Sequence, residues 1–392
     1  MNIMNIMNTM KKKIISLLPA IFFLSFSFLM MSCEKDEVKD PVTQAYVGSE
    51  TCMTCHADHY DKFIKSGHPF KFNKVIDGTQ PVVPYRSEVV PTPAGYGWDD
   101  ITYMIGGYFW KARFIDTKGY IMTEQDDSQF NIADGSQVAY HGSDPMGTKI
   151  YDCGKCHVTG WVSIAEGGTP HDGLEGMGGE FAEGGIHCEA CHGMGAVHAD
   201  SELATDITID NSSADCGRCH TRNEDNSIAA KGGFIKHHEQ YDEWLASGGH
   251  FSSNIGCNTC HDPHASTVND DLAPGEGVKA SCTSCHTDYN MDKHTYGGVT
   301  CVTCHMPLAS KSALKTGDYT GDVHSHTFKI NPAADGTLFN AEGTLANPEG
   351  LGLSLDYACY SCHKDDAGLG GAMSAKTMEE LSAKATNFHG TE

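Results

Sequence analysis

The 392-residue sequence has few long apolar segments beyond its first 32 residues. Hydrophobic residues make up only 40% of the chain, whereas glycine alone accounts for 43 positions. Because burial of apolar side chains is the main favourable contribution to folding, such a chain is poorly suited to build a large core from its own residues. The composition argues against two or three ordinary globular domains and predicts that something other than side chains fills the interior.

Positive charge is also scarce. Lysine and arginine number 27 against 51 acidic residues, which gives a net charge of −24. Removal of the three lysines within residues 1–32 would leave the remaining chain at −27. A field of this sign repels nucleic acid and anionic membrane surfaces and favours cationic partners. We therefore expect no nucleic-acid partner.

The one long apolar run, Ile14–Met31, follows three lysines and precedes Ser32 and Cys33. This layout predicts a lipoprotein-type signal peptide over residues 1–32, with translation starting at Met10. A run of this length is also long enough for a transmembrane helix, but the preceding lysines and the small residue before Cys33 favour the signal.

Cys33 resembles the acylated cysteine of bacterial lipoproteins, although Met30 stands where leucine is more usual. The following segment, 34–37, resembles the acidic export signal of Bacteroidota lipoproteins. The resemblance implies lipidation at Cys33, a linker over residues 33–45 and membrane attachment through a lipid anchor. We expect an exported protein of the cell envelope, an outer-membrane lipoprotein facing the periplasm or the cell surface.

Cysteine is abundant, yet none is left over for a structural disulfide. The pattern Cys-x-x-Cys-His occurs eight times and uses 16 of the 17 cysteines. In chain order, motifs 1 to 8 are Cys52/Cys55/His56, Cys153/Cys156/His157, Cys188/Cys191/His192, Cys216/Cys219/His220, Cys257/Cys260/His261, Cys282/Cys285/His286, Cys301/Cys304/His305 and Cys359/Cys362/His363.

This spacing suits covalent haem. Two cysteines three residues apart lie on one turn and can each form a thioether with a haem vinyl group, and the next histidine reaches the iron as proximal ligand. Zinc sites would leave the adjacent histidine unexplained, and redox dithiols would require eight active sites in one chain. The sequence therefore predicts eight covalently attached haems c.

About 45 residues remain per haem, too few to wrap each one separately. We therefore predict a mainly α and loop, multihaem cytochrome c fold organised by stacked haems, with a small β-hairpin insertion between haems 1 and 2. The hairpin is expected from segments 109–115 and 120–123 and the turn 116–119. It is expected to cover the first haem; the alternative is an element for partner docking or substrate access.

The motif spacing divides the chain into segments. Residues 46–150 are expected to hold the first haem and the β insertion, and residues 151–330 a haem-dense body with haems 2–7. Residues 331–392 are expected to hold haem 8 and a closing helix over 374–385.

Fourteen histidines remain to supply second axial ligands. Segments 60–68 and 241–250 read as a repeat, a short helix ended by glycine that delivers a histidine just beyond its end. In the His237-His238 doublet, one ligand is expected, and His238 is preferred. The predicted distal ligands are His68, His198, His238, His250, His264, His294 and His326. The residues expected instead to face solvent or haem propionates are His59, His141, His171, His187 and His389.

Two segments resemble known families. Residues 47–50 before motif 1, with 66–68 after it, are similar to the opening of cytochrome c-554 and related multihaem cytochromes. Segment 301–307, flanked by His294 and His326, is similar to the multihaem nitrite reductase and octahaem reductase group. The resemblance implies a bis-histidine electron-transfer protein with stacked haem pairs and allows one catalytic haem. Unlike those nitrite reductases, which have lysine in one motif, every motif here ends in histidine.

Two functions follow, and the first is favoured. An electron carrier at the cell envelope would pass electrons through eight mostly bis-histidine haems between redox partner proteins, such as other cytochromes or quinol-linked donors. The alternative is an octahaem reductase or oxidase of nitrite, hydroxylamine or tetrathionate with one open catalytic haem. No catalytic residue is predicted from the sequence.

Overall fold

The computed structural model describes residues 42–84, 89–124, 126–267, 275–287, 289, 294, 298–364 and 376–389. Residues 43–392 belong to one compact unit. The predicted signal peptide, Cys33 and nearly all of the predicted linker lie outside the described residues. No helix within these ranges combines the length and apolar character needed to cross a membrane.

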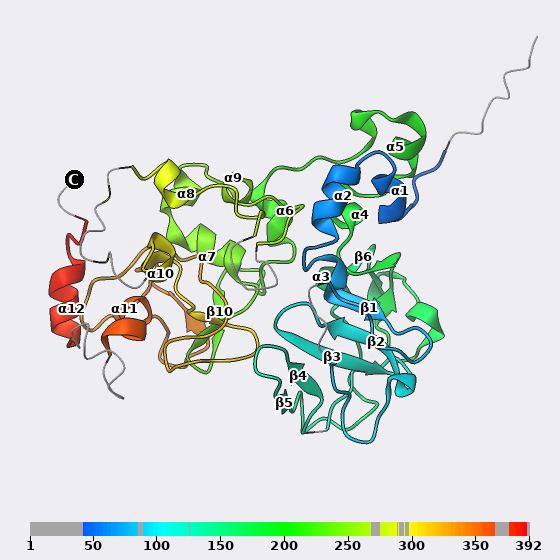
Figure 1. The fold of residues 1–392 in the computed structure, drawn as a ribbon, viewed down its shortest axis with the longest axis horizontal. Helices are drawn as coiled ribbons and strands as arrows, with labels where there is room; N and C mark the ends of the chain where they lie inside the picture. The colour runs from blue at the N-terminus through cyan, green and yellow to red at the C-terminus, as the bar shows by residue number, and fades with distance from the viewer. Residues whose placement is uncertain are drawn as a thin grey trace, which may run out of the picture. The chain divides into compact units, whose positions relative to one another are not determined.

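Short helices joined by long loops dominate the unit (Figure 1). The α-helices are α1 (Ser49–Met53), α2 (Ala57–Phe63), α3 (Gly154–His157), α4 (Cys188–His192), α5 (Ala196–Ser201), α6 (Ser213–Gly217), α7 (Gln240–Ser247), α8 (Gly249–Ser252), α9 (Cys257–Cys260), α10 (Cys301–His305), α11 (Leu355–His363) and α12 (Met378–Ala385). The 3-10 turns are η1 (Pro69–Lys71), η2 (Trp98–Asp100), η3 (Ile164–Glu166), η4 (His171–Gly173), η5 (Ala204–Asp206) and η6 (Cys282–Ser284).

Each Cys-x-x-Cys-His motif lies on or at the end of one of these helical turns. In motifs 1, 4, 5 and 6, the backbone N–H of the histidine donates to the carbonyl of the first cysteine at 2.9–3.0 Å. This i to i−4 bond closes a single α-helical turn. The turn brings both thiols and the imidazole of a motif to one place, as haem attachment requires.

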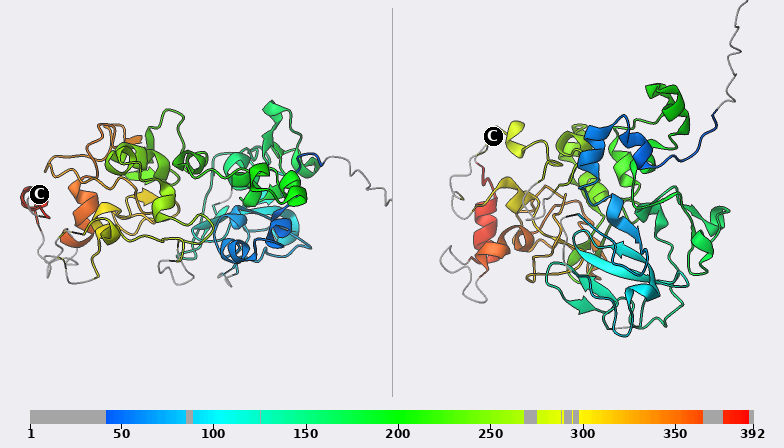
Figure 2. Two further views of the ribbon diagram at one scale, coloured as in Figure 1. Left: turned by 90° about the horizontal axis from the view of Figure 1, so that it is seen from above. Right: turned by 45° about the vertical axis from the view of Figure 1, so that its right-hand side comes forward.

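A five-stranded antiparallel sheet fills the stretch between motifs 1 and 2. Its order is β1 (Phe72–Lys74), β2 (Ile101–Gly106), β3 (Lys111–Asp116), β4 (Gln129–Asn131) and β5 (Gln137–Val138). The buried core of this insertion includes Met104 and Phe114. Both views of Figure 2 show its strands side by side.

The insertion is larger than the predicted hairpin. The turn at Asp116 is present, because the Gly119 N–H donates to the Asp116 carbonyl at 3.1 Å. The segment after it pairs with β3 through a single bridge, Ile115 to Ile121, and the long partner of β3 is β2. Segment 101–106, which was not expected to form a strand, is buried at four of its six positions, three of them consecutive, so its burial does not alternate as in a half-buried strand.

The C-terminal half has a second sheet. Its order is β12 (Ser310–Lys311), β11 (Phe234–Lys236), β10 (Ile228–Lys231) and β13 (Leu345–Ala346). Ile235, Leu338 and Leu353 are fully buried against it. Two-stranded pairs join β6 (Val158–Thr159) to β9 (Glu183–Gly184) and β7 (Val162–Ser163) to β8 (Gly179–Glu180).

The predicted closing helix is observed as α12, which begins later than expected. Thr377 caps it: the Thr377 side chain accepts the Glu380 N–H, and the Glu380 carboxylate accepts the Thr377 N–H. This reciprocal pair satisfies two N–H groups at the helix start and defines its N-terminus. Residues 374 and 375 of the prediction lie outside the described residues.

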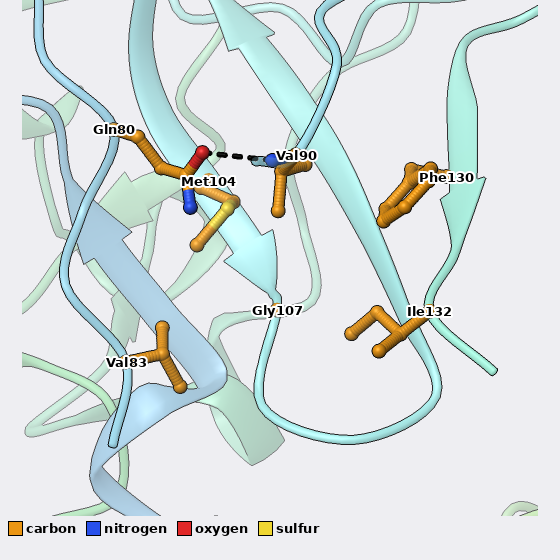
Figure 3. Close-up of a pocket in the computed structure, with 7 residues that line it drawn as sticks. All are labelled: Gln80, Val83, Val90, Met104, Gly107, Phe130 and Ile132. Carbon is orange, nitrogen blue, oxygen red and sulfur yellow. Dashed lines mark hydrogen bonds between the residues drawn. The ribbon is translucent and has the colours of Figure 1, made fainter. Parts of the chain in front are cut away.

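The core of the β insertion is closed rather than hollow (Figure 3). A small apolar cavity lined by Met104 and Phe130 has a volume of about 10 Å³, which is room for one water molecule. Gln80 spans one edge and accepts the Val90 N–H at 2.8 Å. This cavity is too small to hold a ligand and is therefore not a candidate functional site.

Candidate functional site

The motif histidines are the first test of whether the chain fits haem. A metal–imidazole bond is about 2 Å long, so two imidazoles on opposite sides of one iron have ring centres about 6 Å apart. Seven of the eight motif histidines have another histidine ring 5.9–6.4 Å away. The pairs are His56 with His198, His192 with His264, His220 with His68, His261 with His326, His286 with His250, His305 with His389, and His363 with His294.

Backbone carbonyls orient several of these rings. The Nδ1 atoms of His192, His305 and His198 lie 2.7, 2.6 and 2.9 Å from the carbonyls of Thr208, Phe328 and Leu203. A carbonyl can only accept, so Nδ1 carries the proton in each ring. Nε2 is then left with a lone pair for a metal, which is the usual outer-sphere arrangement of a ligating histidine.

Helix α7 holds ligands of two further motifs. The Gln240 side-chain oxygen accepts from His220 Nδ1 at 3.2 Å, and the Glu243 carboxylate accepts the His326 backbone N–H at 2.5 Å. The helix ends at Ser247 because Gly248 adopts a left-handed φ of 75°. His250 follows directly, as the repeat in the sequence predicted.

The structure brings all seven predicted distal residues to within 6.0–6.4 Å of a motif histidine ring; His238 shares its motif histidine with His68. The ring of His238 lies 6.0 Å from His220, but His68 lies 6.4 Å from the same ring, and one iron accepts only one further ligand. The ring of His238 is also 4.3 Å from that of His237. His220 therefore has two candidate partners among the described residues, and both His68 and His238 stay predicted ligands.

His389 was expected to face solvent or a propionate, but the structure places its ring 5.9 Å from that of His305. His389 lies just beyond α12 and far along the chain from motif 7. No sequence pattern around it indicates that it is an axial ligand. The ring of His59 lies 6.4 Å from that of His56, and the expectation that His59, His141, His171 and His187 bind no iron stays a prediction, which the contacts of some of them fit. His187, for example, has Nδ1 2.9 Å from the Ser49 hydroxyl and Nε2 2.9 Å from the Gly184 carbonyl, so neither nitrogen is available to iron.

Replacing His389 with alanine is expected to leave the haem of motif 7 with a single axial histidine. One low-spin ferric signal should then be replaced by a high-spin signal in low-temperature EPR, because the open position weakens the ligand field. The control is His141→Ala, since that half-exposed ring pairs only with nearby Asp144 and Tyr140. An unchanged spectrum with full haem content in the His389 variant would remove this residue from the ligand set.

His157 of motif 2 differs from the other motif histidines. Within the described part of the chain, no other imidazole faces it at the spacing of the seven pairs. The residue is half-buried, its Nδ1 is buried without a hydrogen-bond partner, and cations surround it. Burial and the charges of Lys71, Arg113, Lys111 and Arg222 lower the pKa of His157 to about 3.

The β insertion and η1 supply three of these cations. Lys71 ends η1, and Lys111 and Arg113 are two residues apart on β3, so their side chains share one face of the strand. The Arg113 guanidinium stacks 3.5 Å from the Tyr140 ring centre, and its Nε donates to the Gln129 side chain at 2.8 Å. The insertion therefore contributes to the surroundings of motif 2, which favours the substrate-access interpretation over a cover for haem 1.

The segments that flank α7 and motif 4 supply the other wall. Arg222 Nε donates to the His237 carbonyl at 2.9 Å, and Arg222 Nη2 lies 3.3 Å from His237 Nε2. Burial, followed by the charge of Lys111, lowers the pKa of His237 to about 2. His238 has a left-handed φ of 74°, a conformation that is uncommon outside glycine and that often marks functional sites.

Of the four cations of this site, Arg222 has Glu239 3.8 Å away, and the charge of Asp322 acts on Lys111 from outside ion-pair distance. Burial lowers the pKa of Lys71 to about 8, and burial together with Arg113 lowers the pKa of Lys111 to about 7. No carboxylate among the described residues forms an ion pair with either lysine or with Arg113. Buried charges are stable only when paired, so this cluster is suited to a bound anion.

Thiols of different motifs also meet. Cys52 contacts Cys188, Cys156 contacts Cys219, Cys216 contacts Cys257 and Cys282 contacts Cys301. Motif 3 reaches motif 4 through a hydrogen bond from Arg218 to the Ala190 carbonyl at 3.4 Å. Electrostatic contact between Cys260 and Cys285, and between Cys304 and Cys362, joins motif 5 to 6 and motif 7 to 8. The motifs therefore form one contiguous series, 1-3-4-5-6-7-8, with motif 2 beside motif 4.

The structure gives Cys55 a different contact from the thioether that the sequence predicts for it. The residue is exposed, whereas its motif partner Cys52 is half-buried. The Cys55 Sγ accepts a weak hydrogen bond from the hydroxyl of the adjacent Thr54 at 3.8 Å. This contact joins adjacent residues and follows from the local turn, so it does not test haem attachment. The thioether at Cys55 stays a prediction from the motif spacing. The other exposed motif cysteines are Cys153, Cys191, Cys260, Cys282, Cys285 and Cys362.

Two family models match the chain. The model for cytochrome c554 and c-prime matches residues 120–193, which include motifs 2 and 3, and the doubled CXXCH motif matches residues 250–291, which include motifs 5 and 6. The predicted resemblance to cytochrome c-554 is thereby confirmed, on a segment other than residues 47–68 that suggested it. No curated protein sequence matches the chain.

Three solved structures share the fold. The octahaem sulfite reductase MccA of Wolinella succinogenes superposes with a TM-score of 0.60 at 17% identity, covering 88% of this chain and 71% of MccA. The outer cell wall cytochrome OcwA gives 0.53 at 19% identity, with 88% and 86% covered. The undecahaem S-layer cytochrome of Carboxydothermus ferrireducens gives 0.50 at 19% identity, and this chain spans only 61% of its length. At these identities the likeness shows the fold.

Proposed function

We propose that this chain, which is a multihaem c-type cytochrome, binds eight haems c and reduces a small oxyanion at the haem of motif 2. The other seven haems, each held by two histidines, relay electrons to that site. The observation that carries the proposal is the difference between His157 and the other motif histidines, because a haem with one protein ligand can bind a substrate.

The charge of the site selects the class of substrate. Three buried cations without acidic partners at ion-pair distance face the only described motif histidine that has no ring opposite it. In a chain of net charge −24, such a cluster is a local exception that attracts an anion. Haem propionates could neutralise part of this positive charge, but the three positive charges exceed the two negative charges of the propionates of one haem. Nitrite and sulfite fit this description, and MccA, which shares the fold, is named as a sulfite reductase.

The residues have distinct tasks in this scheme. When bound, haem supplies an open iron position and electrons. Arg113, fixed by Tyr140 and Gln129, binds the anion through its fork of N–H donors. Lys111 donates to the Ser312 carbonyl at 2.7 Å, and with a pKa of about 7 it can both hold the anion and release a proton at neutral pH. This assignment replaces the carrier role favoured by the sequence.

The seven paired histidines support a second candidate function, electron transfer between protein partners without turnover. OcwA and the S-layer cytochrome share this fold, and their names place them at the cell surface. In either case we propose export, a lipid anchor at Cys33 and electron exchange with other cytochromes or quinol-linked donors. Unchanged membrane retention of a Cys33→Ala variant would exclude the anchor.

Low-temperature EPR of the oxidised holoprotein, combined with a haem count from its pyridine haemochrome, tests the proposed function. We expect eight haems, of which one gives a high-spin signal that changes when nitrite or sulfite is added. The turnover number for the added anion should then be on the order of 1–1000 per second. Eight haems that are all low-spin by integration, together with no turnover, would leave the electron carrier as the function.

Anion binding is expected to weaken as the pH rises from 6 to 9. Lys111 and Lys71, with pKa values of about 7 and 8, are both charged at the lower end and neutral at the upper end. A charge-assisted hydrogen bond contributes about 1.5–3 kcal/mol, so the Kd should rise roughly 10- to 100-fold. Nitrite stays ionised over this range and is the probe for optical titration. In Lys111→Met the change near pH 7 should disappear; a flat Kd in the wild-type protein would exclude the lysines.

A further inference from the structure

Arg222 makes a two-point contact with His237 that determines where the ring proton lies. Its Nε donates to the His237 carbonyl at 2.9 Å, and its Nη2 lies 3.3 Å from His237 Nε2. A guanidinium has donors only, so Nε2 must be the acceptor in the second contact. The single ring proton of neutral His237 is therefore on Nδ1.

Both members of this pair are held in place. Glu239, whose side chain is completely buried, has Oε1 3.8 Å from Arg222 Nε, and burial raises the pKa of Glu239 to about 8. The His237 backbone N–H donates to the Lys311 carbonyl at 3.3 Å, so the peptide groups on both sides of the ring are fixed. Within the described residues, His237 Nδ1 makes no hydrogen bond. This N–H therefore has no acceptor within the described part of the protein and can donate to one supplied from outside the chain.

The location of His237 indicates what that acceptor is. The charges of Lys111, Arg222, Arg113 and Lys71 act on His237, and the same four act on His157. The two imidazoles therefore share one cationic environment around motif 2. In this environment a second positive charge on His237 is strongly disfavoured, so the ring can act only as a neutral donor.

We propose that Arg222 is a positioning residue: it holds His237 in the Nδ1–H tautomer, and this N–H donates a hydrogen bond to the oxyanion bound at motif 2. The inference rests on the proposed function of this site and adds the geometry by which the anion is recognised. In this proposal Arg222 orients His237, which contacts the anion, and Arg222 itself does not contact the anion.

A double-mutant cycle separates the two actions. The variants are Arg222→Lys, His237→Phe and the double variant, and the readout is the Kd of nitrite from optical titration of the oxidised holoprotein. Arg222→Lys keeps the positive charge but loses the fork that reaches both the carbonyl and Nε2. We expect each single variant to raise the Kd by about tenfold and the double variant to raise it no further, because both changes remove the same hydrogen bond.

Lys118→Arg is the control, since that lysine is exposed, lies outside every motif and pairs with Glu175 at 3.7 Å. Haem content and the low-spin signals must match the wild-type protein, which checks that motif 4, adjacent to Arg222, is intact. His237→Gln serves where the Phe variant folds poorly. Additive losses would overturn the proposal by showing direct contact between Arg222 and the anion, and so would an unchanged Kd in Arg222→Lys. Absence of any nitrite effect in the wild-type protein would instead defeat the proposed function itself.

Discussion

Replacing Arg113 with glutamine is expected to lower kcat for oxyanion reduction by about 100- to 1000-fold, the usual loss when a preorganised donor to a developing anion is removed. The guanidinium is buried beside motif 2 and held by Tyr140 and Gln129, so it needs no reorganisation when the anion binds. Steady-state kinetics with nitrite and sulfite measure the effect. Arg113→Lys should retain more activity because it keeps the charge but not the stacked, forked geometry.

Arg218→Gln provides the matched comparison, since it removes one guanidinium from an exposed position. Its kinetics should equal those of the wild-type protein. The Arg113 variants should also keep eight haems and unaltered low-spin EPR signals, because the seven histidine pairs do not involve this residue. Equal activity of Arg113→Gln and the wild-type protein would exclude the cationic cluster from the reaction.

Removing the haem of motif 4 is expected to prevent accumulation of folded holoprotein. Cys216→Ala combined with Cys219→Ala deletes both thioethers of a motif whose thiols contact motifs 2 and 5. The chain has little apolar core of its own, so each haem provides buried surface for its neighbours, as bound metal does in small metal-dependent domains. Haem content per chain and thermal unfolding of the purified protein measure the outcome.

The same double substitution in motif 8, at Cys359 and Cys362, is the control. Motif 8 ends the series of contacts, with motif 7 as its only neighbouring motif in the described part of the chain. We expect a protein with seven haems, a lowered Tm and an otherwise intact spectrum. Equal accumulation of both variants with seven haems would show that the haems do not share structural support.

Some parts of the fold could be predicted because they depend on neighbouring residues. A Cys-x-x-Cys-His motif occupies one helical turn, so its spacing reveals the attachment site without any tertiary information. The helix that ends before Gly248 was predictable for the same reason, and so was the existence of α12, although its start was placed too early. The β insertion was underestimated, because β2 pairs with β3 through residues across a loop, and strand pairing of this kind is decided by packing.

The axial ligands show where local reasoning reaches its limit. His68 and His250 follow glycine-ended segments, which gave a local signal, whereas His389 has none and reaches motif 7 only through the fold. The cations around His157 were also missed. Lys111 and Arg113 alternate along a strand, a weak sign of a shared face, but nothing in the sequence places that face against motif 2.

The sequence by itself predicted haem attachment at eight places, because thioether formation and proximal ligation depend on atoms within five consecutive residues. Only the tertiary structure decided which histidines lie opposite one another and which motif is left without a partner. Those relations join residues far apart in the chain, and long-range packing, not local geometry, brings them together. The site around His157 exists because Lys71, β3 and the segment before α7 converge there, and that convergence cannot be read from any one of them.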